Sequence, residues 1–251
     1  MGLNTIYIIF SFLFGACFGS FITMASYRLP RNEDIFFKKS YCPKCNKPIK
    51  YLSLVPILSW VFQGGKCSKC GAKISIRYPL IEIITSGLFV LSYLKFGVNY
   101  NTILFDLLIT VSMIMLISDL ETLIIPDSMQ VCLLILSFIF IYINKLNFIY
   151  SAMSALLYFV VIYIAGFIVE KWKKKSAIGG GDIKFITIAG LTLGLENLPL
   201  FLFISGVIGI IFGLIWKKIT KNEYFPFGPS LIIAYLVLFY TLSNIFISIN
   251  W

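Results

Sequence analysis

Histidine is absent from all 251 residues, and charged residues make up only 13% of the chain. The missing imidazole excludes Ser-His and Cys-His nucleophiles, histidine-bound catalytic metals and histidine proton relays. Acid–base chemistry must therefore use carboxylates, of which the chain has only eleven. The low charge, together with 59% hydrophobic residues, also excludes the usual composition of a water-soluble globular domain.

The hydrophobic residues fall in uninterrupted blocks of bilayer-spanning length, which predicts an all-α polytopic membrane protein with about eight transmembrane helices. The expected spans are about 5–27, 79–96, 101–118, 129–144, 148–170, 182–195, 198–216 and 228–248. The first carries no small-residue cleavage signal, so we expect an uncleaved anchor. We predict three parts: a first transmembrane helix at 1–27, a soluble loop at 28–78 and a membrane domain at 79–251.

The basic residues indicate which way the chain crosses the membrane. Of the 21 Lys and Arg residues, eleven lie in 28–77, five in 171–184 and three in 217–221, and only Lys95 and Lys145 lie elsewhere. The positive-inside rule then places these three loops in the cytoplasm and both termini outside. Because topology accounts for the net charge of +10, we expect no nucleic-acid partner.

The loop at 28–78 contains two CxxC motifs separated by 21 residues. Their thiols are Cys42, Cys45, Cys67 and Cys70. Four thiols at this spacing are typical of one tetrahedral zinc ion that folds a module too small for its own core. Two disulfides are the alternative, and the predicted reducing compartment favours zinc. Cys17 and Cys132 lie inside hydrophobic spans and are interpreted as small buried side chains.

Three acids lie at the predicted cytoplasmic ends of hydrophobic segments. Asp119 ends one span, Asp182 opens another after Gly179-Gly180-Gly181, and Asp127 follows Pro126. Acids at such positions are costly and indicate function. Two carboxylates in unlike surroundings share a proton, so that one activates water while the other polarises a carbonyl, as in aspartic proteases. We interpret Asp127 as a helix cap, and helix polarity favours the shared proton on Asp119.

Glu82 lies near the start of another predicted span, after Arg77-Tyr78-Pro79. A carboxylate there is either a partner for the helix dipole or for Arg77, or a functional group, and both interpretations stay open.

Taken together, these motifs resemble the bacterial type IV prepilin peptidases, which are GxGD intramembrane aspartic peptidases that usually also N-methylate the mature pilin. The matching segments are Gly19-Ser20-Phe21 with Tyr27-Arg28-Leu29-Pro30, the paired CxxC motifs, Arg77-Tyr78-Pro79 with Glu82, Asp119 through Ile125-Pro126-Asp127, Gly179-Gly180-Gly181-Asp182 with Lys184, and Pro226-Phe227-Gly228-Pro229. They are spread over the whole chain.

The resemblance implies that Asp119 and Asp182 are the catalytic dyad and need no cofactor for cleavage. It implies prepilin or pseudopilin substrates with a short basic leader, cut after glycine at the cytoplasmic face of the inner cell membrane. It also implies methyl transfer from S-adenosylmethionine to the new N-terminus. The N-terminal motifs, the cysteine module and Glu82 are the candidates for that second activity.

Other functions fit parts of the sequence. A zinc-stapled membrane assembly factor without catalysis explains the spans and cysteines but leaves two costly acids unexplained. An ion-coupled transporter places its acids near the midplane, whereas these acids gather at one face. A peptidase without methyltransferase activity also remains open.

Overall fold

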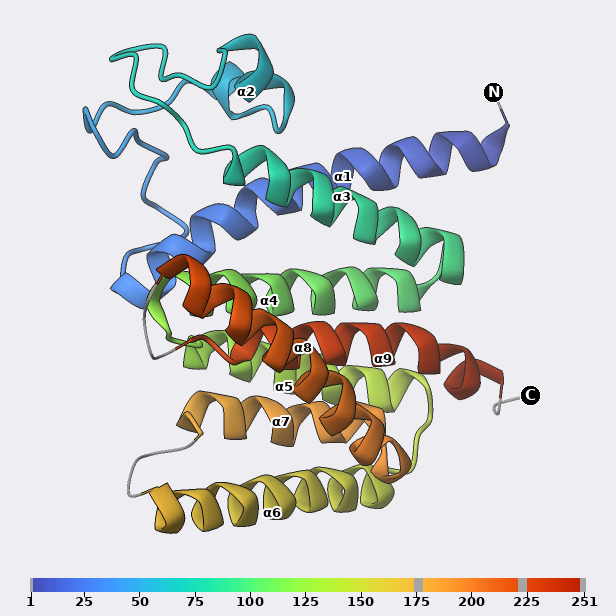
Figure 1. Ribbon diagram of the computed structural model, residues 1–251. Helices are drawn as coiled ribbons and strands as arrows, with labels where there is room; N and C mark the ends of the chain where they lie inside the picture. Colours follow the sequence, from blue (N-terminus) through green and yellow to red (C-terminus); the bar gives the residue numbers. More distant parts are fainter. Residues whose placement is uncertain (1, 174–177, 221–224, 249–251) are drawn as a thin grey trace. The chain divides into compact units, whose positions relative to one another are not determined.

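The computed structural model describes residues 2–173, 178–220 and 225–248, and these residues fold almost entirely into helices (Figure 1). They form no β-strand, and two isolated bridges, Tyr41–Pro48 and Lys66–Lys73, lie between the first two long helices. The all-α prediction is therefore confirmed. The loop lysines Lys174, Lys175 and Lys221, which entered the charge argument, lie outside the described residues.

The chain divides into two compact units, residues 1–114 and 115–251. The α-helices are α1 (Leu3–Arg28), α2 (Leu58–Phe62), α3 (Arg77–Phe96), α4 (Tyr100–Thr122), α5 (Asp127–Ile143), α6 (Phe148–Lys173), α7 (Gly180–Leu193), α8 (Leu198–Thr220) and α9 (Gly228–Ser248). Short 3₁₀ helices occupy Leu29–Arg31, Tyr51–Leu54 and Leu195–Asn197. The predicted three-part division stays a prediction, since it separates membrane segments from a loop rather than compact units.

Five helices of the described chain are long and apolar enough to cross a membrane, whereas the sequence predicted about eight spans. The five segments are Leu3–Arg31, Arg77–Phe96, Tyr100–Thr122, Phe148–Trp172 and Leu195–Thr220. Asp127–Ile143 and Gly228–Leu242 are apolar but shorter. At 14 residues, α7 is roughly 21 Å long, against a hydrocarbon core of about 30 Å. A membrane protein is confirmed, and the number eight is not.

In the first unit, α1 packs closely along α3, as Figure 1 shows. Gly15 and Gly19, four residues apart, lie at this contact: a Cβ atom at Gly15 would lie 2.7 Å from the Cα atom of Ser86, and one at Gly19 would lie 2.6 Å from the Cα atom of Glu82. Small residues at this spacing let two helix backbones approach, as is common in membranes. The contact therefore sets the position of Glu82.

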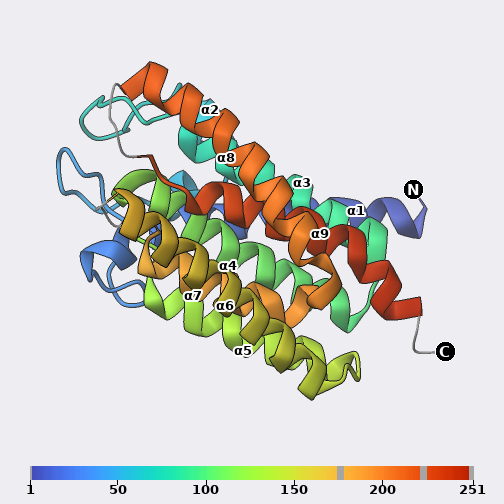
Figure 2. The same ribbon diagram turned by 60° about the horizontal axis from the view of Figure 1, so that its bottom comes forward.

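In the second unit, α7 packs against α5, α6 and α9 (Figures 1 and 2). Gly190 lets α6 approach, because a Cβ atom there would lie 3.0 Å from the Cα atom of Ala155. On the other side, Phe185 meets the ring of Tyr235 edge-on, with centroids 5.7 Å apart. The residues of α7 from Phe185 onward are mostly buried, so the second unit holds this short helix on several sides.

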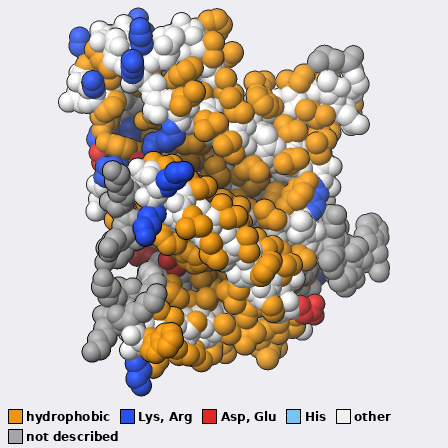
Figure 3. Space-filling view, viewed as in Figure 1, with side chains coloured by type: hydrophobic (Ala, Val, Ile, Leu, Met, Phe, Trp, Pro, Cys, Tyr) orange, Lys and Arg blue, Asp and Glu red, His pale blue; other side chains and the backbone are white. Residues whose placement is uncertain are grey.

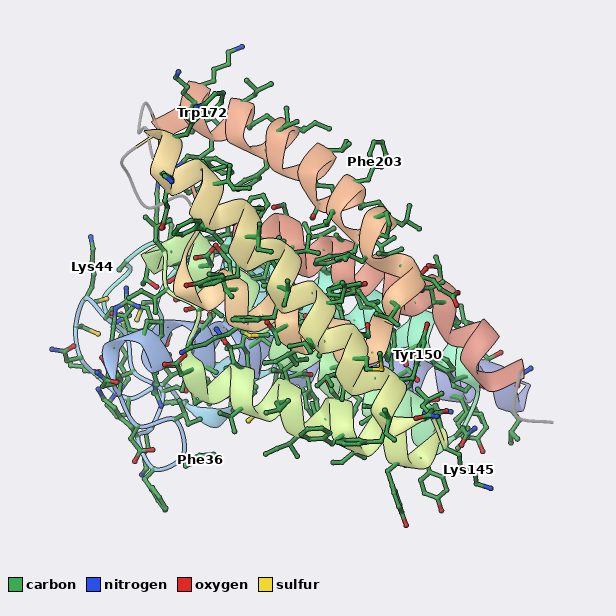
Figure 4. The ribbon with its side chains drawn as sticks, turned by 90° about the horizontal axis from the view of Figure 1, so that it is seen from below. Phe36, Lys44, Lys145, Tyr150, Trp172 and Phe203 are labelled. Carbon is green, nitrogen blue, oxygen red and sulfur yellow. The ribbon has the colours of Figure 1, made fainter. Side chains whose placement is uncertain are left out.

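The outward faces of the long helices are hydrophobic. Figure 3 shows hydrophobic side chains over most of the visible helical surface, and Lys and Arg side chains on the segment between α1 and α3 at the top left. In Figure 4, Trp172 near the end of α6 and Phe203 on α8 point away from the protein, and both are highly exposed. Large exposed apolar faces of this kind suit contact with lipid.

Candidate functional site

Asp119 lies near the C-terminal end of α4 and is only 6% exposed. One carboxylate oxygen, Oδ2, accepts a hydrogen bond from the backbone N–H of Gly228, the first residue of α9, at 3.0 Å. A Cβ atom at Gly228 would lie only 2.6 Å from that same oxygen. The position next to Asp119 therefore has room for glycine and no larger residue.

Asp182 lies in the first turn of α7 and is half-buried. Its carboxyl group interacts electrostatically with that of Asp119. The side chain of Ile125 lies beside Gly181, which precedes Asp182, and beside Gly228, which contacts Asp119. A Cβ atom at Gly181 would lie 3.3 Å from that side chain, and one at Gly228 would lie 3.2 Å from it. In the second unit the two acids, 63 positions apart in sequence, are therefore near enough for their carboxyl groups to interact.

The glycines before Asp182 do not serve a tight turn. Gly179 has an ordinary extended backbone, with φ −65°, and Gly180 and Gly181 are not among the glycines with positive φ. Space is what matters at Gly181, because Ile125 and the side-chain amide of Gln130 lie against its backbone. That amide donates to the Gly181 carbonyl at 3.2 Å. Gln130 was not predicted from the sequence. The only feature that could have indicated it is that it is a polar residue in an otherwise apolar helix.

Asp127 does not cap α5, contrary to the interpretation from the sequence. It is the first residue of the helix, and no side-chain hydrogen bond caps that end. Instead its carboxylate pairs with Lys184 of α7 at 2.7 Å, and both side chains are exposed. The pair links α5 to α7 two residues beyond Asp182, and it lies in solvent while Asp119 is buried.

The four predicted metal ligands converge in the first unit. The sulfur atoms of Cys42, Cys45, Cys67 and Cys70 all lie within 4.8 Å of one another. The sulfurs of Cys42 and Cys70 are 3.9 Å apart, close to the roughly 3.8 Å between thiolates on a tetrahedral zinc ion with 2.3 Å bonds. A disulfide would need about 2.05 Å. All six cysteines are unpaired, so the geometry fits a metal ion better than two cystines.

The two cysteine motifs have matching backbone hydrogen bonds. In the first, the N–H of Asn46 donates to the Cys42 carbonyl, and in the second, the N–H of Gly71 donates to the Cys67 carbonyl, both at 2.8 Å. Asn46 and Gly71 both have left-handed backbones, with φ 53° and 69°. Asparagine and glycine are residue types that tolerate this conformation. Each motif is thus a closed turn that presents two thiols.

The thiols differ in how readily they ionise. Backbone N–H groups of Lys69 and Cys70 donate to the Cys67 sulfur and lower the pKa of that thiol to about 7. At Cys70 the amide of Ala72 acts in the same direction, but partial desolvation and the neighbouring thiols outweigh it and raise the pKa to about 11. Four crowded thiols cannot all ionise unaided, and a cation bound among them would supply the missing charge.

Glu82, in the second turn of α3, is buried and holds the loop rather than standing at a free helix end. Its Oε2 atom accepts the backbone N–H of Ile57 at 2.6 Å. Ile57 has φ 61°, a strained conformation for a β-branched residue that surrounding contacts must maintain. Neither interpretation of Glu82 from the sequence anticipated this contact.

Two family models together match most of the chain. Residues 13–96 match the model of the bacterial peptidase A24 N-terminal domain, and residues 107–214 match that of the type IV leader peptidase family. The four clustered cysteines and Glu82 fall in the first region, and Asp119, Asp127 and Asp182 in the second. No solved structure matches the chain significantly.

Curated relatives extend the match over nearly the whole chain. A protein of Neisseria gonorrhoeae is 31% identical over 94% of this chain and 91% of its own length. A protein of Bacillus subtilis is 30% identical over 90% of this chain and 92% of its own length. A protein of Vibrio cholerae is 28% identical over 94% of this chain and 98% of its own length. All three are named prepilin leader peptidase/N-methyltransferase. The chain belongs to the type IV leader peptidase family.

Proposed function

We propose that this protein cleaves the short basic leader from type IV prepilins or pseudopilins through Asp119 and Asp182, and that it N-methylates the new N-terminus. The carrying observation is the convergence of the two acids, one buried and bonded to the Gly228 amide, the other at the start of α7. A pair of interacting carboxylates is the arrangement that aspartic proteases use.

In this mechanism the two carboxyl groups share one proton. The ionised member takes a proton from water, which attacks the carbonyl carbon of the scissile peptide bond, while the protonated member hydrogen-bonds to the carbonyl oxygen. The proton then passes to the leaving nitrogen as the C–N bond breaks. The Gly228 amide orients the Asp119 carboxyl, and Gln130 orients the backbone that carries Asp182.

Two groups complete the proposed enzyme. Cys42, Cys45, Cys67 and Cys70 form a thiolate set that fits a structural zinc ion, which would fold the segment between α1 and α3. S-adenosylmethionine is implied by the second half of the relatives' name and, when bound, supplies an activated methyl group. Glu82 is our candidate residue for that activity.

We place the protein in the cytoplasmic (inner) cell membrane, with both termini outside and the cleavage site facing the cytoplasm. The support is the distribution of Lys and Arg among the loops. A basic leader would then meet the Asp119–Asp182 site on the side where it is synthesised.

The test is incubation of purified protein with a pilin-like precursor and S-adenosylmethionine, read by intact mass. Wild-type protein should remove the leader and add one methyl group to the product. Asp119→Asn and Asp182→Asn should each abolish cleavage, because each removes half of the proton-sharing pair. Asp127→Asn is the matched control and should keep most activity, since its exposed ion pair contributes at most about 1 kcal/mol. An inactive Asp127→Asn with an active Asp119→Asn would refute the dyad.

A further inference from the structure

A cavity of about 440 Å³ lies within the first unit, between the last turns of α1, the first turns of α3 and the cysteine-bearing segment. This volume is in the range of small-molecule sites. Helix α1 contributes Ser20 and Tyr27, α3 contributes Tyr78 and Glu82, and the segment between them contributes Trp60 and Cys42. The Asp119–Asp182 site has none of these residues.

Two buried charges and a set of exposed lysines line the cavity. The buried cation is Arg28, whose guanidinium already donates to the backbone carbonyls of Asp34, Lys38 and Lys39. Glu82 is the only carboxylate among the lining residues and is 7% exposed. Lys44, Lys47, Lys50, Lys69 and Lys73 also line the cavity, and all five are exposed. A ligand that fits has a cationic centre for the interior and an anionic end for the rim. A purely anionic ligand, such as a phosphate, would set its charge against Glu82.

Aromatic rings provide the remaining recognition surface. Trp60, Tyr27 and Tyr78 line the cavity and are half-buried. The indole of Trp60 is held in place, because its N–H donates to the Ile74 carbonyl at 3.2 Å. A fixed indole is a good stacking surface for a nucleobase and for a cation.

Glu82 retains capacity for a ligand while it holds the wall. A carboxylate has about four lone-pair sites, of which the Ile57 amide uses one and the Ser20 hydroxyl a second. That hydrogen bond holds the strained backbone at Ile57 against the start of α3. Ile57 directly precedes α2, the short helix that contains Trp60. The same side chain therefore shapes the cavity and places a negative charge inside it.

We propose that this cavity binds the methyl donor, with Glu82 facing the sulfonium centre, Trp60 stacking on the adenine and the rim lysines meeting the amino-acid carboxylate. The proposal rests on the methyl-transfer half of the proposed function. In that reaction the product's N-terminal nitrogen forms a bond to the methyl carbon as the carbon–sulfur bond breaks. The bonding pair stays on sulfur, which becomes a neutral thioether, and the nitrogen releases a proton to solvent.

The first test separates charge recognition from cavity shape. Calorimetry on purified full-length protein in detergent compares two probes, sinefungin, whose protonated amine replaces the sulfonium, and neutral S-adenosylhomocysteine. Glu82→Gln keeps a carbonyl oxygen for the Ile57 amide but loses the charge. It should weaken sinefungin binding about tenfold, as one lost charge-assisted contact predicts, and S-adenosylhomocysteine binding less than about threefold.

The matched control is Glu33→Gln. Glu33 is in the same segment, pairs with Lys38 and is outside the cavity lining. This variant should keep wild-type affinity for both probes. Equal weakening of both probes by Glu82→Gln would show that Glu82 only shapes the wall, and unchanged binding would show that the cation lies elsewhere. Either result overturns the proposal.

A second test addresses the ring. Trp60→Leu should weaken both probes alike, by about tenfold, because base stacking contributes about 1–3 kcal/mol. Trp172→Leu, at an exposed position near the end of α6, is the control and should have no effect. Retained affinity in Trp60→Leu would contradict the proposed adenine site.

The intact-mass assay distinguishes failure of this proposal from failure of the proposed function. Methylated product from wild-type protein that binds neither probe would place the donor outside this cavity and leave the proposed function standing. Cleaved product without a methyl group would refute the second activity, and with it the reason for a donor site.

Discussion

At the residue scale, Asp119 depends on a backbone amide 109 positions away in the sequence. In the sequence, Asp119 lies at the negative end of its own helix, and that polarity alone favoured the shared proton there. The structure adds the positive end of α9, whose first N–H groups are not used within the helix. The polarity of α4 alone therefore does not assign the shared proton to Asp119. The contact with Gly228 could not be predicted from the residues around Asp119, because the two are far apart in the sequence.

The glycine at that contact is open to a direct test. Gly228→Ala would set a methyl group 2.6 Å from the Asp119 carboxylate, so the acid must move and lose the Gly228 hydrogen bond. Losing a hydrogen bond to a charged group costs about 1.5–3 kcal/mol, so cleavage should fall roughly 10- to 100-fold. Initial rates of precursor cleavage measure this.

Gly206→Ala is the control for that experiment. It adds the same methyl group on α8, where nothing lies within 4 Å of the new atom, and its cleavage rate should match wild type. A Gly228→Ala protein as active as Gly206→Ala would mean that the amide does not position Asp119.

At the scale of elements, the sequence predicted much of what forms locally. Each of the eight predicted apolar segments overlaps one α-helix, because composition and turn residues such as Pro79 mark helix starts without tertiary information. The paired thiols were predicted for the same reason. The hydrogen bonds from Ile57 to Glu82 and from Gln130 to Gly181 were not predicted, because each joins two segments that are distant in the sequence and that no periodic pattern relates.

The cysteine module gives a prediction about metal. Replacing Cys42 or Cys67 by Ser should remove one equivalent of zinc from the purified protein and weaken binding of both donor probes, because Cys42 and Cys67 also line the cavity. Cleavage should suffer less, since Asp119 and Asp182 are on other segments. Elemental analysis and calorimetry measure the two effects.

Cys132→Ser supplies the comparison, as Cys132 lies on α5 outside the cluster and should keep full metal content. Purified wild-type protein with no zinc and four oxidised thiols would instead support the disulfide alternative.

The contact between α1 and α3 gives a second prediction for an element. Gly19→Ala should push α1 away from Glu82 and destabilise the protein by about 1–3 kcal/mol, as overpacking does, seen as a lower thermal midpoint in detergent. On α3, Gly87→Ala meets nothing within 4 Å and should leave the midpoint unchanged. Equal midpoints for the two variants would show that the close approach is not needed.

At the scale of the whole molecule, hydropathy predicted more membrane-spanning helices than the structure supports. The short segment containing Asp182 was predicted as a span, but α7 is enclosed by helices of its own unit. An enclosed helix is as apolar as a lipid-facing one, so composition does not distinguish them. The number of spans therefore cannot be predicted without knowing how the helices pack, whereas membership of the membrane class can be predicted from composition.

Membrane orientation is testable in cells. With both termini outside, Lys145→Cys at the turn after α5 should react with an impermeant maleimide added to spheroplasts, above the background of the parent protein. Lys218→Cys, exposed near the end of α8, should react only after permeabilisation. The reverse pattern would place the Asp119–Asp182 face outside and contradict the proposed orientation.

The two closed turns of the cysteine module lie far apart in the chain, so an ion bound to both is a cross-link. It ties down the ends of the stretch 46–66, which contains Ile57 and Trp60. Without that tie, the stretch regains the conformational freedom of an open loop, and closing it again costs entropy that grows only slowly with loop length. Metal occupancy would then act on donor affinity through the chain entropy of this stretch, in addition to the cavity wall that Cys42 and Cys67 form.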